Sequence, residues 1–435
     1  MGKRYRPYEA YKPSFAKWSG DVPDHWMPIR LKYVFDEKKK QLNPKLPAGS
    51  ISFGNVIFKN EESLAAETKA SYQEVLAGEF LINPLNMNFD LKSLRTALSS
   101  INVVVSTGYM VLQSAEGYSK NYLRWLLQQF DVAHMKTLGA GVRQTIGFDD
   151  IGNSFIFQPT YEEQTQIAAF LDYETAKIDE LIAKQERLIE LLEEKRQAVI
   201  SHTVTKGLNP SAPMRPSSID WLGDIPAHWE VKKLSHCTSI ISGQVDPRKH
   251  PYDEYTLIAP NHIQSKTGKI VKLESARDQK AESGKYLCSH GEVIYSKIRP
   301  ALAKACLTPN EKTICSADMY PIAGIGGLSN EFLLWNLLSG WFTALTILES
   351  ERVAMPKINR EKLAEVMLPI PPMNEQSEIC LTIHNQTTQL DNLIVKTHLA
   401  IALLKERRIA LISAAVTGKI DVRDWTAPYQ EDQAA

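Results

Sequence analysis

The sequence of 435 residues has no apolar run long enough to cross a membrane, and its first residues lack the apolar core of a signal peptide. Its five cysteines are scattered, odd in number and without zinc-ligand spacing. This usage predicts free thiols, no metal site and a cytoplasmic location. The formal net charge is zero, which argues against a simple polycationic coat for nucleic acid. A local basic face would still suffice to bind phosphates.

Catalytic motifs are also scarce. No Gly-x-x-x-x-Gly-Lys-Ser/Thr loop is present, so ATP hydrolysis by that route is excluded. The run Asn83-Pro84-Leu85-Asn86 matches the Asn/Asp-Pro-Pro-Tyr/Phe motif of amino-methyltransferases at only its first two positions. Asp36-Glu37-Lys38-Lys39 could be fitted to a nuclease pattern, but a solvated charge run explains it better. The sequence therefore predicts a chain that is not an enzyme and binds no cofactor of its own.

Two long stretches that copy each other dominate the sequence. Residues 162–202 align with residues 374–414 without a gap at an offset of 212, so that Gln164 falls on Gln376 and Arg196 on Arg408. So long a period excludes a short solenoid repeat. It indicates a duplicated unit made of one globular part and one long helix.

Both stretches have helical periodicity. Thr160 and Glu163 form a capping box after Pro159 at the start of the first helix. About 40 residues at 1.5 Å per residue give a rod of roughly 60 Å, and a narrow apolar stripe of that length predicts an antiparallel coiled coil of the two helices, the alternative being that each packs on its own domain. The predicted seam is Leu171, Ile178, Leu181, Leu188, Leu192 and Val199 in the first helix and Ile383, Leu390, Leu393, Ala400, Leu404 and Leu411 in the second. Thr397 and Arg407 are also placed on seam positions of the second helix.

A second repeated phrase opens each globular part. Trp18-Ser19-Gly20-Asp21-Val22-Pro23-Asp24-His25-Trp26 returns as Trp221-Leu222-Gly223-Asp224-Ile225-Pro226-Ala227-His228-Trp229, at an offset of 203. We interpret the phrase as a turn held by two aromatic side chains. Catalysis by its histidine is disfavoured, because no nucleophile or carboxylate constellation accompanies it.

The globular parts share a skeleton of short strands and one helix, but their loops differ. Two readers of different ligands on one scaffold would look like this, and so would a duplication that has drifted. The fold class expected is α+β, with two mixed domains, two long helices in an antiparallel coiled coil and a pseudo-two-fold internal repeat. The expected order is an arm (1–17), a first globular domain (18–158), a first long helix (159–207), a linker (208–220), a second globular domain (221–370), a second long helix (371–420) and a tail (421–435).

The two opening phrases, the Glu-Gln helix starts and the Val-Thr helix ends resemble those of the specificity subunit of Type I restriction-modification systems. So do Gly291-Glu292-Val293-Ile294-Tyr295-Ser296-Lys297-Ile298-Arg299-Pro300 and Gly78-Glu79-Phe80-Leu81-Ile82-Asn83-Pro84. The resemblance extends over about residues 18–422. It implies a non-catalytic DNA-binding subunit in which each domain reads one half of a bipartite target and the coiled coil sets the spacing.

The same resemblance implies the partners: double-stranded DNA, two adenine-N6 methyltransferase subunits on the helices and two restriction (motor-nuclease) subunits. S-adenosylmethionine, ATP and Mg²⁺ are then expected in those partners. A coiled-coil scaffold that tethers proteins without reading DNA is the alternative. DNA-contacting candidates, chosen because Arg and Lys suit guanine edges or phosphates and Gln suits adenine, are Arg143, Gln144, Gln244, Lys297, Arg299 and Lys357.

Overall fold

The computed structural model describes residues 5–16, 18–62, 64–84, 94–138, 146–240, 242–350 and 356–428. The chain divides into two compact units, residues 1–184 with 400–435 and residues 185–399. The division cuts both long helices, α4 (Tyr161–Lys206) and α9 (Met373–Val416). Each unit therefore contains one globular domain and one part of each long helix. The mixed helix-and-sheet class expected from the sequence is confirmed.

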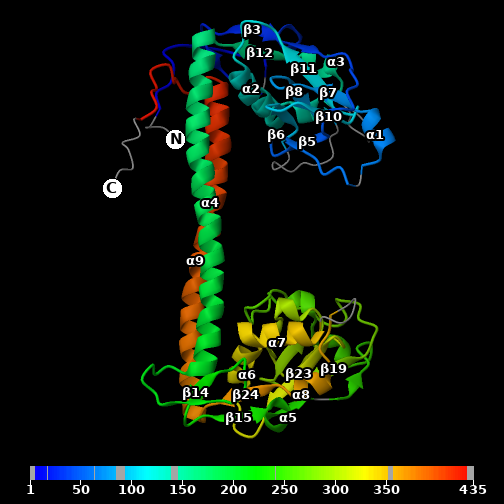
Figure 1. Cartoon of the computed structure of the whole chain (residues 1–435), viewed down its shortest axis with the longest axis vertical. Helices are drawn as coiled ribbons and strands as arrows, with labels where there is room; N and C mark the ends of the chain where they lie inside the picture. Colours follow the sequence, from blue (N-terminus) through cyan, green and yellow to red (C-terminus); the bar gives the residue numbers. More distant parts are fainter. Residues whose placement is uncertain are drawn as a thin grey trace. The chain divides into compact units, whose positions relative to one another are not determined.

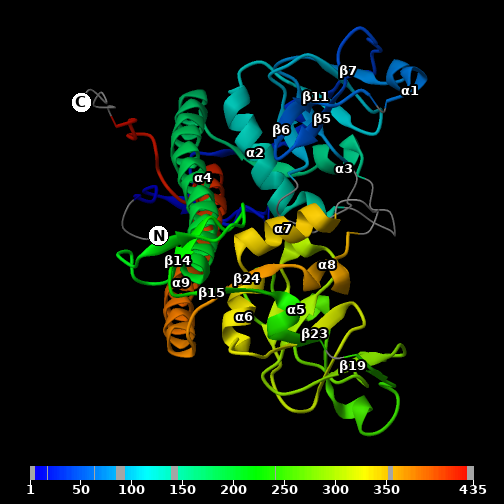
Figure 2. The same ribbon diagram turned by 60° about the horizontal axis from the view of Figure 1, so that its bottom comes forward.

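The first unit is built on a six-stranded sheet of order β4-β11-β8-β9-β6-β5, antiparallel except between β6 and β9. Its central strand β8 is fully buried, which explains why it reads as a continuous apolar run. In both views α2 lies between this sheet and α4 (Figures 1 and 2). The strands of the sheet are β4 (Phe35–Glu37), β5 (Gly49–Ser52), β6 (Asn55–Phe58), β8 (Phe80–Ile82), β9 (Thr96–Leu98) and β11 (Met110–Ser114).

Three two-stranded ladders complete the first unit. They join β1 to β2, β3 to β12 and β7 to β10. Their strands are β1 (Tyr11–Lys12), β2 (Val22–Pro23), β3 (Met27–Arg30), β7 (Gln73–Val75), β10 (Val103–Val105) and β12 (Phe155–Gln158). The helices and 3-10 turns are η1 (Leu31–Tyr33), α1 (Ala66–Ala70), α2 (Lys120–Ala133), η2 (Met135–Thr137) and α3 (Phe148–Gly152).

The second unit has a different sheet arrangement, with two four-stranded sheets of order β16-β23-β20-β21 and β17-β19-β22-β18. Its main core joins the sheet around β20, helices α6 and α7, and the flanking parts of α4 and α9. The sheet strands are β16 (Thr238–Ile240), β17 (Gln244–Val245), β18 (Thr256–Ile258), β19 (Lys285–Cys288), β20 (Val293–Ser296), β21 (Ala305–Leu307), β22 (Thr313–Cys315) and β23 (Met319–Gly324). The remaining elements are β13 (Met214–Pro216), β14 (Asp224–Pro226), β15 (Glu230–Lys233), α5 (Leu234–Cys237), η3 (Tyr252–Glu254), η4 (Pro260–His262), η5 (Pro300–Leu302), α6 (Asn330–Leu337), α7 (Gly340–Ser350), α8 (Arg360–Ala364) and β24 (Met367–Ile370).

The strand ladders around the opening phrases repeat with an offset of 203. Tyr11 pairs with Pro23 in the first unit, and Met214 pairs with Pro226 in the second. Each phrase thus contains the second strand of a small ladder with a turn on either side of it, so the turns expected from the sequence are present. No single helix among the described residues has the length and apolarity to cross a membrane. The bent pair α6–α7 meets that test together, and most of α6 is buried in the core of the second unit.

Candidate nucleic-acid interface and its helical framework

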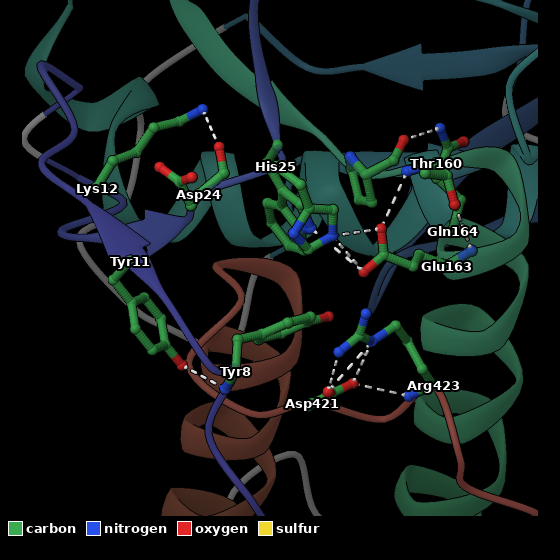
Figure 3. Close-up of polar contacts among 12 residues, drawn as sticks. Tyr8, Tyr11, Lys12, Asp24, His25, Thr160, Glu163, Gln164, Asp421 and Arg423 are labelled. Atoms are coloured by element: carbon green, nitrogen blue, oxygen red, sulfur yellow. Dashed lines mark hydrogen bonds and ion pairs between the residues drawn. The ribbon is translucent and has the colours of Figure 1, made fainter.

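Glu163, in the first turn of α4, ties the first opening phrase to the helix. Its side chain is 5% exposed, and its two carboxylate oxygens each lie 3.0 Å from Nε2 of His25 (Figure 3). The indole N–H of Trp26 donates to the same carboxylate at 3.5 Å. Glu163 also accepts from the backbone N–H of Thr160 at 3.2 Å, and Thr160 Oγ1 accepts from the N–H of Glu163 at 3.3 Å. The predicted capping box is therefore confirmed, and its carboxylate holds the opening phrase as well.

The second unit repeats this contact. Nε2 of His228 lies 2.8 Å from Glu375 Oε2, and the indole of Trp229 donates to that oxygen at 3.1 Å. Glu375 occupies the position of Glu163 at the offset of 212. Each opening histidine thus serves as a structural partner of a helix-start glutamate.

The neighbouring glutamines fasten the helix starts to the domains. Gln164, with no exposed surface, accepts from the backbone N–H of Ser119 at 3.0 Å, and Ser119 is the N-cap of α2. Gln376, equally buried, accepts from the N–H of Ser329 at 2.9 Å, and Ser329 is the N-cap of α6. A side-chain amide can donate and accept at once, so it satisfies buried backbone groups on both sides. This explains why the Glu-Gln pair stands out in the sequence.

The C-terminal ends of the long helices also contact the domains: the end of α4 contacts the second domain, and the end of α9 contacts the first. A Cβ on Gly207, beyond the end of α4, would lie 3.1 Å from the Trp229 ring. A Cβ on Gly418, beyond the end of α9, would lie 3.1 Å from the Trp26 ring. Both glycines have positive φ (74° and 70°), which favours glycine at a helix C-terminus. Each domain is therefore held by the start of one long helix and the end of the other.

The two helices run antiparallel within each unit, and equivalent ion pairs fix their register. Arg196 Nε lies 2.9 Å from Asp391 in the second unit, and Arg408 Nε lies 2.8 Å from Asp179 in the first. The two arginines are equivalent at the offset of 212, and so are the two aspartates. The pairs are related by the pseudo-two-fold repeat that the sequence predicted.

The seam predicted from apolar residues needs correction. Leu181, Leu188 and Leu393 are 47%, 41% and 48% exposed, so they lie outside the buried stripe. Arg407 is also exposed, and its neighbour Arg408 takes the seam position. The structure buries Leu171, Ile178, Ile383, Leu390, Leu411 and Thr397, and it half-buries Leu192, Val199, Ala400 and Leu404.

Polar side chains explain the error. Thr175, Arg196 and Thr203 are at most 6% exposed and lie on the buried stripe. Each is three or four positions from an apolar residue of the stripe, as in Leu171–Thr175–Ile178 and Arg196–Val199–Thr203. Hydrogen bonds make them acceptable there: Thr175 Oγ1 donates to the carbonyl of Leu171 at 2.6 Å, and Thr203 Oγ1 to that of Val199 at 2.8 Å. A seam sought only among apolar residues therefore slips onto the neighbouring face.

The arm and the tail meet beside Glu163. The backbone of Asp421 forms an antiparallel β-bridge with that of Arg6. The Asp421 carboxylate forms a bidentate ion pair with Arg423, whose guanidinium carbon lies 5.1 Å from the centre of the Tyr8 ring (Figure 3). Burial and the nearby Glu163 raise the pKa of Tyr8, so the phenol stays protonated. Burial alone would raise the pKa of Asp421, but the hydrogen bonds from Arg423 lower it overall. These contacts hold the arm and the tail together beside the start of α4.

The DNA candidates of the second domain come together at the end of β20. The backbones of Ile298 and Lys357 form an antiparallel β-bridge, and the backbone N–H of Arg299 donates to the carbonyl of Pro356 at 2.9 Å. Lys297 Nζ lies 5.4 Å from the centre of the Tyr320 ring. Backbone contacts thus bring Lys297, Arg299 and Lys357 into one basic cluster, with the Tyr320 ring beside Lys297. Basic side chains with neighbouring aromatic rings are typical of nucleic-acid surfaces.

Further groups extend this cluster. Arg360 lies over the rings of Tyr320 (5.3 Å) and Tyr286 (6.0 Å), and Gln244 pairs with Tyr286 in the ladder of β17 and β19. Burial raises the pKa of Tyr320, although Arg360 opposes the shift. Sequence reasoning missed Arg360 and the two tyrosines, because nothing in their local sequence distinguishes them. The first-domain candidates Arg143 and Gln144 lie outside the described residues.

Known proteins are similar to this chain both in sequence and in fold. Residues 226–397 match the family model of the Type I restriction modification DNA specificity domain. The chain is 29% identical over 324 residues to the Type I restriction enzyme EcoDI specificity subunit of Escherichia coli, covering 70% of this chain and 71% of that protein. This chain is similar in sequence to the Type I specificity subunits. The resemblance noted from the sequence is thereby confirmed.

A second relative extends the similarity over nearly the whole chain. The Type I restriction enzyme MjaVIII specificity subunit of Methanocaldococcus jannaschii is 21% identical over 429 residues, covering 93% of this chain and 95% of that protein. Two solved structures share the fold. A chain from a type I R-M system has a TM-score of 0.68 at 16% identity, covering 92% of this chain and 99% of that chain. The HsdS subunit from Thermoanaerobacter tengcongensis has a TM-score of 0.51 at 16% identity, covering 92% and 98%.

Proposed function

We propose that this chain is the non-catalytic subunit that gives a Type I restriction-modification complex its DNA sequence specificity. Each globular domain reads one half of a bipartite target, and the two long helices set the distance between the half-sites. Methyltransferase subunits dock on the helices and supply S-adenosylmethionine chemistry. Restriction subunits join through them and supply ATP- and Mg²⁺-dependent steps.

The duplicated framework is the observation that carries this proposal. The same carboxylate–histidine–tryptophan contact, buried glutamine and arginine–aspartate pair occur once in each unit. The domains that this framework holds have different sheets, one of six strands and two of four. A fixed frame with divergent domains suits a protein that reads two different sequences at a set spacing. The helices contain 46 and 44 residues, which corresponds to about 65–70 Å at 1.5 Å per residue, enough for half-sites one or more DNA turns apart.

Both helices also have apolar side chains for partners. Leu181, Leu188 and Leu191 of α4 are 41–47% exposed, and Leu381, Leu393, Leu399 and Leu403 of α9 are 48–63% exposed. Repeated exposed leucines on a structural helix indicate a protein-docking surface. Within the described residues, no group of three or more His, Cys, Asp or Glu side chains could hold a metal ion. The proposal places the chemistry in the partner subunits.

Methylome sequencing tests the proposal. Cells that express the cognate methyltransferase with this chain should methylate adenine in a split motif with a fixed spacer, and cells without the chain should not. Exchanging residues 18–158 for the corresponding domain of a relative should change one half of the motif only. Methylation that is unchanged by removing the chain would refute the proposal and favour a protein scaffold instead.

A further inference from the structure

A β-hairpin in the first domain has no role in the framework. β5 and β6 pair antiparallel with Gly49 opposite Phe58 and Ser52 opposite Asn55. The loop between them consists of Phe53 and Gly54, both with positive φ (47° and 78°). A two-residue loop of this kind is the tight connection that matches the strand twist, and it favours Asn-Gly, because a bulky side chain is strained at positive φ. An aromatic residue at this tip therefore costs stability.

The Phe53 side chain gains no burial in return. It is 75% exposed, the highest exposed fraction among the large hydrophobic side chains that the structure describes. Phe58 and Ile57 on the same hairpin are 60% and 43% exposed. A strained, exposed aromatic tip indicates a contact made with another molecule.

The two faces of the hairpin differ. Ile51 and Val56 are opposite each other and pack into the core of the sheet. Alternation along the strands places Ser50, Ser52, Asn55 and Ile57 on the other face. Short hydroxyl and amide side chains with one aliphatic group are suited to hydrogen bonds with base edges and to contact with thymine methyl groups.

The stretch of sequence that contains the hairpin is rich in lysine. Residues 38–60 contain five lysines and no aspartate or glutamate. Lys38 is paired with Glu74 and Glu79. The other four, Lys39, Lys40, Lys45 and Lys59, are exposed and have no ion pair among the described residues. Lys59 lies at the base of the hairpin, where its backbone N–H donates to Ala48 at 2.8 Å.

We infer that the β5–β6 hairpin enters the major groove of duplex DNA and is a reading element of the first domain, with Asn55 and the serines at base edges, Phe53 at the tip and Lys45 and Lys59 at phosphates. This inference rests on the proposed function. A two-stranded ribbon fits a groove about 12 Å wide. The local excess of lysine favours DNA over a protein partner as the occupant, because phosphates demand positive charge and apolar docking does not.

The test uses the full chain assembled with its methyltransferase subunit. Binding to duplex DNA is measured by fluorescence anisotropy at several salt concentrations, and the methylated motif is read by sequencing. The variants are Phe53→Ala, Asn55→Ala, Lys45→Ala and Lys59→Ala. The matched control is Tyr33→Ala, a 63% exposed aromatic on η1, which packs against α3 away from the hairpin.

Asn55→Ala and Phe53→Ala should weaken binding to the specific site by on the order of 10-fold and relax one half of the motif only. Lys45→Ala and Lys59→Ala should weaken binding to all sequences and each reduce the slope of log affinity against log salt by about 0.9. Tyr33→Ala should change neither property, and every variant should assemble with the methyltransferase as the native chain does.

Two results would overturn the inference while leaving the proposed function intact: variants that keep both half-sites and native affinity, or variants whose defect is loss of methyltransferase assembly. The second result would make the hairpin a protein-docking element. A native complex that methylates no bipartite motif would refute the proposed function, and the inference with it.

Discussion

The paired arginines of the two long helices allow a matched test of the framework. Arg196 and Asp391 have side chains 5% and 15% exposed, whereas those of Arg408 and Asp179 are 25% and 51% exposed. Arg196 also donates to the carbonyls of Lys266 at 2.6 Å and Thr267 at 3.4 Å. Its removal leaves one carboxylate and two carbonyls without this donor, although Lys269 stays 2.6 Å from Asp391.

We therefore expect Arg196→Ala to lower the free energy of unfolding of the second unit by about 3 kcal/mol, near the low end for breaking one partner of a buried pair. Arg408→Ala should cost about 1 kcal/mol or less in the first unit, because water screens an exposed pair. The same ion pair occurs at both sites, so the expected difference comes from its burial and from the two carbonyls that Arg196 also binds.

Hydrogen exchange followed by mass spectrometry on the full chain measures both effects at once. A loss of about 3 kcal/mol corresponds to a roughly 100-fold faster exchange of the amides of α9 around Asp391, where exchange proceeds by unfolding. Replacing both partners, Arg196→Met with Asp391→Leu, should recover much of the protection, because no buried charge is then left alone. Equal losses at Arg196 and Arg408, or a larger loss at Arg408, would refute the reasoning.

Three further predictions concern the buried polar groups. Gln376→Ala should destabilise the second unit by about 3 kcal/mol in urea unfolding, because its amide contacts Ser329, Gly327 and Pro371 with no exposure; the exposed Gln389 serves as the control position. Trp229→Phe should cost about 1–2 kcal/mol in the same assay, since it removes the 3.1 Å bond to Glu375 and keeps most of the ring. Burial raises the pKa of Cys237 to about 11 and of Cys306 and Cys380 to about 12, so alkylation at pH 8 should be slow in the folded chain and fast in urea. Thiols of the unfolded chain ionise at about pH 8.5, roughly 2 to 4 units below the buried thiols. The contribution of these thiols to the free energy of unfolding should therefore be complete below about pH 8.5 and be lost as the pH rises toward 12.

The sequence predicted the parts of the fold that repeat. The gapless offset of 212 identified both helices, and the Thr160–Glu163 capping box was visible because both of its partners are local. The opening phrases could be recognised as turns, but their partners Glu163 and Glu375 could not, since these contacts span 138 and 147 residues. The seam was misplaced where hydrogen-bonded threonines and an ion-paired arginine occupy buried positions that periodicity assigns to apolar residues.

The recognition surfaces were harder to predict. Lys297 and Arg299 were chosen from one run of sequence and Lys357 separately, and the β-bridge between Ile298 and Lys357 brings the two choices together. The hairpin of β5 and β6 was missed because Phe53-Gly54 is not a typical turn signal, and because the lysines after Asp36-Glu37 were interpreted as a solvated charge run. Its signal was the absence of acidic residues between positions 38 and 60.

The bridge between Arg6 and Asp421 has a topological consequence. At the offset of 203 between the opening phrases, the position equivalent to Arg6 is Asn209. At the offset of 212 between the long helices, the position equivalent to Asp421 is also Asn209, which lies within the continuous linker of the second unit. One strand contact in the first unit thus stands where the second has a covalent connection. The connectivity is that of a ring of two repeats, opened at one of two equivalent points. A chain reordered to begin near Asn209, with residues 421 and 6 joined by a short linker, would keep every strand pairing and every helix contact described above.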